Sequence, residues 1–351
     1  MNLRPIYGHT ALLHRLAGAL ASSRFPQAAL FTGGPGVGKQ RLALWVAQGL
    51  LCQTGPGEPC GKCSSCAQVL RLGHPDLHWF VPVPRPKAGD SDKQVEQVKE
   101  LLAEVMAERR NQPFYRRAEG MVSHALASIR LLQRVVSLTP FQGPCKVVVL
   151  GDAERLVVQE ASQEAANALL KVLEEPPDDT VVILTTSEPQ GLLPTIRSRL
   201  VPLRVGRVGD TAVKEFLQRE LAPPIEGEAL KRRTLLAEGS IGRALWAQDS
   251  DNEADRAAKD LLKAIEGGAS EWSLRTLAQA PWAARGDFTA ILEALAVRLR
   301  DRLAAGTSAG NDLRSHLAAL RRVEETRAEA QSNANPQLAM AVLASDLEQL
   351  L

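Results

Sequence analysis

A glycine-rich stretch, TGGPGVGKQR at residues 32–41, constrains the fold of this chain more than any other feature. The apolar segment AALFTG at residues 28–33 leads into it and predicts a short strand, while apolar residues recur at near-helical spacing over residues 39–51. A strand, a glycine-rich turn and a helix in this order form a phosphate-binding loop (P-loop), whose backbone N–H groups hold anions. The stretch therefore predicts an α/β nucleotide-binding fold.

The loop keeps the phosphate-binding residues and departs from the usual metal-binding one. Gly33, Gly36, Gly38 and Lys39 retain the cradle of the pattern G-x-x-x-x-G-K-[ST], so we assign them to a site for ATP or ADP. Gln40 stands where a hydroxyl would hold Mg²⁺. Because an amide is longer than a hydroxymethyl group, we expect Gln40 to displace or remove the Mg²⁺ site. The alternative is a P-loop retained only as scaffolding.

Two further apolar runs extend the α/β pattern. KVVVLGD at residues 146–152 and TVVILTTS at residues 180–187 are rich in β-branched residues, as in a parallel sheet covered on both faces. Between them, apolar residues follow Ala166 at i+3, i+4 and i+7, and Pro176 stops this helix. We predict an α/β domain over residues 1–205.

The rest of the chain is predicted to be an insertion and two helical regions. Residues 82–125 begin with a stretch rich in Pro, Lys and Gly and continue into a polar helix, so we interpret them as an insertion on the α/β core. After residue 205 the strand pattern ends, and Ala, Leu, Glu and Arg dominate. A break rich in Asp, Ser and Asn predicts a small helical domain at 206–250 and a larger helical domain at 251–351.

Four of the five cysteines fall within residues 52–66. Cys52, Cys60, Cys63 and Cys66 are spaced C-x7-C-x2-C-x2-C, and a C-x2-C pair brings two thiolates of one tight turn to the same tetrahedral Zn²⁺. Four thiolates leave no open coordination position, so the predicted zinc is structural. The alternative is a disulfide pair or a redox-active C-x2-C motif.

Length and charge set broader bounds. A chain of 351 residues is long for one domain and predicts two or three. Lys and Arg total 42 against 40 Asp and Glu, so bulk charge does not attract the chain to nucleic acid. The longest apolar runs are far shorter than the roughly 18 residues that a membrane span needs, so we expect a cytoplasmic protein without membrane contact.

Two more stretches complete a recognisable constellation. NALLKVLEEPP at residues 167–177 and PTIRSRL at residues 194–200 follow the P-loop and the four-cysteine segment in order. Together these motifs resemble the clamp-loader branch of the AAA+ ATPases, and within it the delta-prime subunits of bacterial DNA polymerase III, over most of residues 25–250. The resemblance implies an AAA+ module with a zinc insert, followed by a helical lid domain and an all-α collar domain.

The resemblance also identifies residues expected at the nucleotide. Asp152 matches the family's metal-side carboxylate, and Ser187 matches the polar residue near the γ-phosphate. Active relatives have Glu where this chain has Ala153, whose methyl group cannot orient the attacking water, and we expect Glu154 to point elsewhere. Active relatives also carry a lid arginine where Gly242 stands. The resemblance therefore implies a chain without intrinsic ATPase activity.

Arg199 is the one catalytic residue that the resemblance implies. It lies in the segment SRL, where the family has a Ser-Arg-Cys motif whose arginine enters the neighbouring subunit's ATP site as an arginine finger. Leu200 replaces the Cys, and we expect it to pack within its own subunit. The alternative is an ion pair between Arg199 and a carboxylate of its own domain.

The function that the resemblance implies is that of a non-hydrolysing stator subunit in the DNA polymerase III clamp loader. The expected partners are motor subunits and a delta subunit in a hetero-oligomeric ring, the sliding clamp, and primed DNA through indirect or weak contact, in the nucleoid-associated replisome. One alternative is an ATP-hydrolysing motor subunit of the same ring. Another is a zinc-dependent DNA-binding module, for which Lys62 and Arg71 are too few basic residues beside the cysteines.

Overall fold

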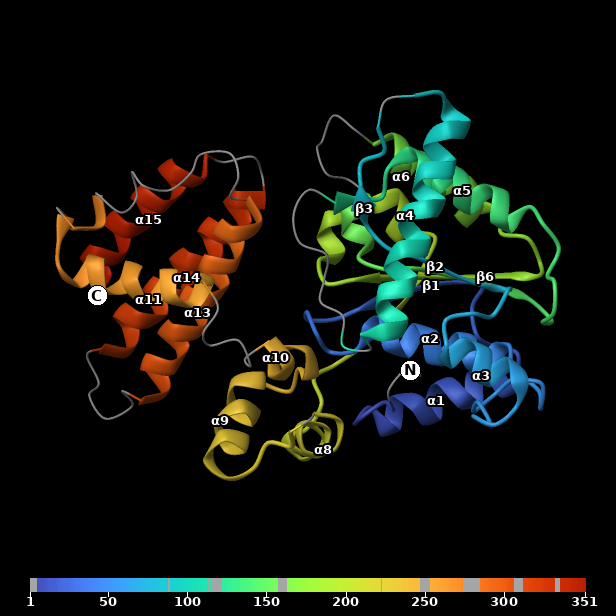
Figure 1. Cartoon of the computed structure of the whole chain (residues 1–351), viewed down its shortest axis with the longest axis horizontal. Coiled ribbons are helices and arrows are strands. Elements are labelled where there is room, and N and C mark those ends of the chain that lie inside the picture. Colours follow the sequence, from blue (N-terminus) through green and yellow to red (C-terminus); the bar gives the residue numbers. More distant parts are fainter. Residues whose placement is uncertain are drawn as a thin grey trace. The chain divides into compact units, whose positions relative to one another are not determined.

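The computed structural model divides the chain into two compact units, Met1–Ala247 and Gln248–Leu351 (Figure 1). The structure describes residues 5–87, 89–112, 114, 122–156, 163–221, 223–246, 253–269, 271–273, 285–305, 312–331 and 335–351. Parts of the predicted insertion, residues 88, 113 and 115–121, lie outside this set. The first unit includes the helices that directly follow residue 205.

A parallel sheet forms the centre of the first unit. Its strands lie in the order β2-β5-β6-β1-β7, and all neighbouring pairs are parallel. Their bounds are β1 (Ala28–Thr32), β2 (Leu77–Phe80), β5 (Lys146–Leu150), β6 (Thr180–Thr186) and β7 (Val201–Arg204). The apolar run of β5 is buried at every position, as both faces of the sheet are covered. The predicted parallel α/β fold is confirmed.

Helices cover the two faces of this sheet (Figure 1). On one face lie α1 (Thr10–Ala21), α2 (Lys39–Leu50) and α3 (Ser64–Leu70), and on the other lie α4 (Ser91–Asn111), α5 (Leu126–Val136) and α6 (Glu164–Glu174). The short pieces are the 3₁₀ turns η1 (Ala153–Leu156) and η2 (Pro189–Gly191), helix α7 (Pro194–Arg197), and the antiparallel pair β3 (Val83–Pro84) and β4 (Val122–Ser123). The pair β3–β4 joins the two ends of the predicted insertion.

A small helical cluster completes the first unit. It consists of α8 (Asp210–Glu220), α9 (Gly227–Ala237) and α10 (Ile241–Trp246). Phe216 is buried at its centre and contacts the rings of Tyr7 and Phe114 edge-to-face, at centroid distances of 5.5 and 5.4 Å. The hydroxyl of Tyr7 donates to Glu220 Oε1 at 2.6 Å. The N-terminal segment and the insertion therefore both contact the α8–α10 cluster.

The regular structure of the second unit is helical within its described residues. Its helices are α11 (Glu253–Glu266), α13 (Arg285–Ala305), α14 (Asp312–Gln331) and α15 (Pro336–Leu350). Apolar residues of all four helices pack into one core that includes Phe288 and Leu343. Asn335 caps the start of α15: its side chain accepts from the N–H groups of Gln337 and Leu338, and Pro336 takes the first turn, where its missing N–H costs nothing. No helix in the described ranges combines the length and apolar character of a membrane span.

Candidate functional site

The P-loop lies at the carboxyl end of β1 and requires its glycines. Gly36 and Gly38 have φ values of +74° and +95°, a left-handed region that side chains disfavour. A Cβ at Gly33 would lie 2.2 Å from the carbonyl oxygen of Val205. These three predicted site residues are thus also required by the backbone of the loop itself.

The P-loop lysine is directed back into the loop. Lys39 is only 6% exposed, and its Nζ donates to the carbonyl oxygens of Gly33 at 2.9 Å and Gly34 at 2.8 Å. A third bond, at 2.9 Å, goes to Ser187 Oγ at the end of β6. The structure therefore brings Lys39 and Ser187 together, as expected for two residues of one phosphate site.

The first residues of α10 rest directly on the P-loop backbone. Ser240 Oγ donates to the carbonyl oxygen of Pro35, and Gly242 N donates to that of Gly36, both at 2.9 Å. A Cβ at Gly242 would lie 2.5 Å from Gly36 Cα, closer than real contacts allow. Only glycine at position 242 is compatible with this approach.

The N-terminal segment holds the other side of the loop. His9, which has a φ of +57°, donates from Nε2 to the carbonyl oxygen of Val37 at 2.8 Å. With the bonds from Lys39, Ser240 and Gly242, each carbonyl from residue 33 to residue 37 accepts a hydrogen bond. Sequence reasoning did not identify His9 or Ser240, because nothing in their local sequence indicates a contact with a loop so far along the chain.

The side chain of Gln40, which stands where the P-loop pattern has a Mg²⁺-binding hydroxyl, packs against the end of β5. Its amide lies against Gly151, at the end of β5 and just before Asp152, such that a Cβ at Gly151 would lie 2.8 Å from each amide atom. Gln40 Oε1 is buried and has no hydrogen-bond partner among the described residues. This arrangement places a neutral amide, and not a hydroxyl, between α2 and the end of β5.

The residues after β5 place one carboxylate differently from the sequence expectation. Asp152 has a φ of +50°, and the following residues turn as η1, with Ala153 fully buried. Glu154 was expected to point elsewhere, but it is 8% exposed and its Oε1 accepts from Ser187 N at 3.4 Å. That expectation is wrong, because the left-handed residue and the 3₁₀ turn direct Glu154 toward the end of β6.

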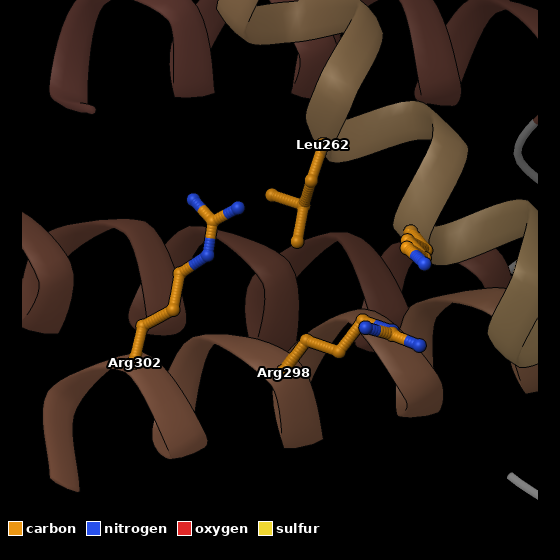
Figure 2. A pocket seen from close by; sticks show the side chains of 4 residues that line it. Leu262, Arg298 and Arg302 are labelled. Carbon is orange, nitrogen blue, oxygen red and sulfur yellow. The ribbon is translucent and has the colours of Figure 1, made fainter. Parts of the chain in front are cut away.

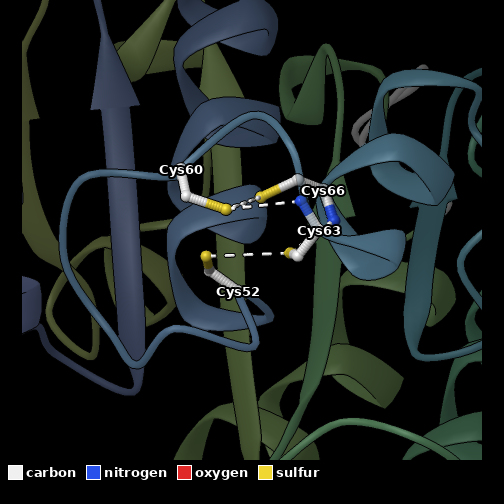
Figure 3. Close-up of side chains that lie close together, drawn as sticks. All are labelled: Cys52, Cys60, Cys63 and Cys66. Atoms are coloured by element: carbon white, nitrogen blue, oxygen red, sulfur yellow. Dashed lines mark hydrogen bonds between the residues drawn. The ribbon is translucent and has the colours of Figure 1, made fainter.

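The four predicted zinc cysteines gather at the far end of α2 (Figure 3). Their sulfur atoms all lie within 4.8 Å of one another, with Cys52 and Cys63 at 3.9 Å and Cys60 and Cys66 also at 3.9 Å. Zinc–sulfur bonds of about 2.3 Å in a tetrahedron place sulfurs about 3.8 Å apart, so the cluster fits a Zn²⁺. All four cysteines are free thiols in this structure.

The backbone around the cluster prepares thiolates for a metal. The N–H of Cys63 donates to Cys60 Sγ, and the N–H of Cys66 donates to Cys63 Sγ, both at 3.4 Å. The N–H groups of Lys62 and Cys63 lower the pKa of Cys60 to about 6, whereas burial raises the pKa of Cys66. The donors thus favour the charged sulfur that binds a cation.

Arg199 lies exposed after α7, beside the end of α6. One guanidinium nitrogen donates to Glu174 Oε1 at 2.5 Å and another to the carbonyl oxygen of Thr195 at 2.8 Å. Its side chain is 34% exposed, while Leu200 is buried in the core. The ion pair within its own domain, stated above as the alternative for Arg199, is therefore present, and it orients a guanidinium that water still reaches.

The parallel sheet with a glycine-rich loop after β1 defines a P-loop α/β protein. The model of the family described as "DNA polymerase III, delta subunit" matches residues 8–208, more than half of the chain. The chain belongs to this family, and the predicted resemblance to clamp-loader subunits is confirmed.

The chain is similar to several curated clamp-loader subunits. It is 36% identical over 214 residues to DNA polymerase III subunit delta' of Pseudomonas aeruginosa, covering 60% of this chain and 52% of the relative. It is 28% identical over 244 residues to subunit delta' of Bacillus subtilis, covering 70% and 60%. It is also 28% identical over 316 residues to subunit tau/gamma of Haemophilus influenzae, covering 84% and 40%. The chain thus spans about half the length of the curated relatives that it matches.

Solved structures show a more distant likeness. A gamma subunit-related protein of Thermotoga maritima covers 97% of this chain and 99% of its own, at 16% identity and a TM-score of 0.47. The Bacillus subtilis clamp loader delta protein covers 96% and 99%, at 10% identity and a TM-score of 0.31.

Proposed function

We propose that this chain is a non-hydrolysing subunit of the DNA polymerase III clamp loader, which supports ATP-driven loading of the sliding clamp onto primed DNA. In this proposal α8–α10 form the lid, residues 251–351 form the collar that joins the ring, and the motor and delta subunits are neighbours. The observation that carries the proposal is the contact of Gly242 with Gly36. In active relatives, the residue at the position of Gly242 contacts the nucleotide.

The contact between Gly242 and Gly36 supports a subunit that does not bind and hydrolyse ATP in repeated cycles. In active relatives an arginine at the position of Gly242 reaches the nucleotide, but here Gly242 N is bonded to the P-loop carbonyl of Gly36. The adjacent Arg243 forms an ion pair with Glu238 at 2.6 Å and so is turned away from the loop. In this proposal, these contacts hold α10 against the loop whether or not a nucleotide is bound.

The residues that active relatives use to bind the metal and to orient the attacking water are also replaced in this chain. Phosphoryl transfer to water needs a metal beside the phosphates and a residue that orients the attacking water. Gln40 has a neutral amide where the P-loop pattern has a metal-binding hydroxyl, and Ala153 is a buried methyl group. Hydrolysis therefore lacks two of its parts, even though Lys39 and Ser187 are in place.

The same proposal assigns Arg199 to the neighbouring subunit's ATP site. Its pair with Glu174 is half-exposed, and such surface pairs contribute about 0–1 kcal/mol. Exchanging this carboxylate for a phosphate group thus costs little, while an arginine supplied in trans accelerates phosphoryl transfer about 10³- to 10⁵-fold. Glu174 therefore orients the Arg199 side chain, but the pair is weak enough for Arg199 to exchange it for a phosphate group.

The cysteine cluster has a structural role in this proposal. Cys52, Cys60, Cys63 and Cys66 bind one Zn²⁺, which would link the end of α2 to α3 with no open position for chemistry.

One observation favours the motor subunit as a second candidate. Glu154 Oε1 accepts from Ser187 N, and Ser187 Oγ accepts from Lys39, so an acidic group lies close to the P-loop lysine. A motor subunit would use Glu154 in place of the family's usual Glu. Steady-state ATP hydrolysis by the isolated chain, abolished by Glu154→Gln, would support that candidate.

Reconstitution tests the main proposal. Rings assembled with Lys39→Ala should load clamp at close to the wild-type rate, because this chain contributes no hydrolytic step, and the isolated chain should show no ATPase above background. Omission of the chain should abolish loading. If Lys39→Ala stopped loading in rings that still assemble, nucleotide at this P-loop would be functional and the proposal would fail.

A further inference from the structure

The N-terminal segment before α1 contacts two parts of the first unit that lie far apart in the sequence. Tyr7, Gly8 and His9 are consecutive and half-buried. They directly precede α1, whose buried leucines belong to the core around the sheet. We call residues 7–9 the strap, because they connect this core, the α8–α10 cluster and the P-loop.

Tyr7 attaches the strap to α8. Its hydroxyl donates to Glu220 Oε1 at 2.6 Å, and its ring contacts that of Phe216 edge-to-face at a centroid distance of 5.5 Å. Edge-to-face aromatic pairs stabilise a contact beyond the area that they bury. Both partners belong to α8, so this helix loses two contacts if it moves away from the strap.

Gly8 lets the strap approach the segment that leads into α8. Its φ is +68°, and a Cβ here would lie 2.8 Å from Val208 Cγ1 and 3.2 Å from Ala212 Cβ. Val208 N in turn donates to the carbonyl oxygen of Gly239 at 2.8 Å, directly before Ser240, which is bonded to the P-loop. The strap therefore packs on a surface that continues to the start of α10.

His9 attaches the strap to the P-loop. Its Nε2 donates to the carbonyl oxygen of Val37 at 2.8 Å, and its own carbonyl oxygen accepts from Leu13 N at 2.9 Å in the first turn of α1. Two residues of chain span at most about 7 Å, so the attachments at Tyr7 and His9 are held within that distance. The strap thus leaves little freedom between α8 and the P-loop.

We infer that the strap is a conformational device that couples the position of the α8–α10 cluster to the backbone of the P-loop. Ser240 and Gly242 bond the cluster to the loop directly, and the strap joins the two a second time through Tyr7 and His9. Release of Tyr7 from α8 therefore also loosens α10 from the loop. Movement of the cluster and opening of the loop are one event.

This inference deepens the proposed function and rests on it for the role of the cluster as a lid. Its test uses the isolated full chain and needs no ring. Clamp loading by reconstituted rings tests the proposed function separately, so either can fail while the other stands.

Hydrogen exchange at the amide of Gly242 measures the coupling, because this N–H donates to the P-loop carbonyl of Gly36. Tyr7→Phe removes only the hydroxyl group, and His9→Gly removes the imidazole while glycine tolerates the φ of +57°. Each variant should accelerate exchange at Gly242 by roughly 2- to 13-fold, the factor that corresponds to the loss of one net hydrogen bond. Tyr7 does not contact Gly242, so a role confined to α8 would leave this rate unchanged.

Two matched variants control for the loss of an ion pair elsewhere. Glu228→Gln breaks a pair with Lys231 at 2.7 Å inside α9, which keeps its internal contacts when the cluster moves as a body. Figure 2 shows Arg302 of α13 in the second unit, and Arg302→Gln breaks its pair with Glu266 of α11, also at 2.7 Å. Neither variant should change exchange at Gly242.

The amide of Val147 in β5 provides the reference for opening of the whole unit. It lies in a buried strand and donates to the carbonyl oxygen of Asp76 at 2.8 Å. In the wild type, Gly242 should exchange faster than Val147, because the cluster opens without the sheet. The inference is overturned if these two amides exchange at the same rate, if Tyr7→Phe leaves exchange at Gly242 unchanged, or if a control variant accelerates it equally.

Discussion

Replacing Gly242 by alanine perturbs the contact on which the proposed function depends. The new Cβ would lie 2.5 Å from Gly36 Cα and 3.2 Å from the Gly36 carbonyl oxygen, both of them backbone atoms that cannot rotate away. We expect α10 to move off the P-loop, with loss of the bonds from Gly242 to Gly36 and from Ser240 to Pro35.

The size of the effect follows from those two bonds. Each net hydrogen bond contributes about 0.5–1.5 kcal/mol, so Gly242→Ala should lower the free energy of unfolding by about 2 kcal/mol. In a unit of this size, about 1 kcal/mol corresponds to roughly 2–4 °C, and the melting temperature should fall by about 4–8 °C. Amide exchange at Gly242 should accelerate at the same time.

Gly18 provides the matched control for this experiment. It is exposed within α1, and a Cβ at this position would meet nothing within 4 Å. Gly18→Ala should therefore raise stability by roughly 0.5–1 kcal/mol through the better helix propensity of alanine. If Gly242→Ala behaved like Gly18→Ala, with unchanged exchange at position 242, the close contact between α10 and the loop would be refuted.

Three further predictions concern other parts of the first unit. Purified protein should contain one equivalent of zinc by elemental analysis, and Cys63→Ser should lower that content; an unchanged content would exclude the cysteine site. Arg199→Ala should preserve ring assembly but lower the DNA- and clamp-stimulated ATPase rate of the ring by the contribution of one ATP site. Arg199→Lys should restore that rate only partly, because an ammonium group lacks the planar fork of a guanidinium. Wild-type rates for both variants would leave Arg199 a structural residue. Asp76→Asn should destabilise the chain at pH 7. Burial raises the pKa of Asp76, but the backbone N–H groups of residues 141–143 donate to its carboxylate and have the larger combined effect. They hold the pKa below its usual value and so stabilise the charged form in the folded chain. The wild-type advantage is present in full above about pH 4 and should decrease as the pH falls through the lowered pKa. In a pH titration of the unfolding free energy, an advantage that does not decrease at any pH below about 4 would contradict this origin.

The interior of the sheet was predictable, but its edges were not. The runs of β5 and β6 are rich in β-branched residues and buried at nearly every position because both faces are covered, and this pattern is visible in the sequence. Strands β2 and β7 lie at the two edges of the sheet, are short, and carry His78 and Pro202. A proline is acceptable on an edge strand because one row of N–H groups has no partner there, so neither segment has a clear strand pattern.

The candidate site was predictable only where it is local in sequence. The P-loop glycines and the four cysteines lie within short segments whose spacing fixes their geometry. The position of Glu154 depends on a left-handed Asp152, and the bond from His9 to Val37 joins residues 28 positions apart. Such contacts follow from tertiary packing and leave no periodic signal.

The helix that follows the P-loop is fastened at both of its ends. Helix α2 has 12 residues and a length of roughly 18 Å; it begins at the loop held by α10 and His9, and it ends next to Cys52 of the cysteine cluster. Because both ends of α2 are held by these contacts, neither end can move independently of its surroundings. It is therefore a rigid connection between the loop and the cysteine cluster, and any movement of one relative to the other has to occur outside this helix.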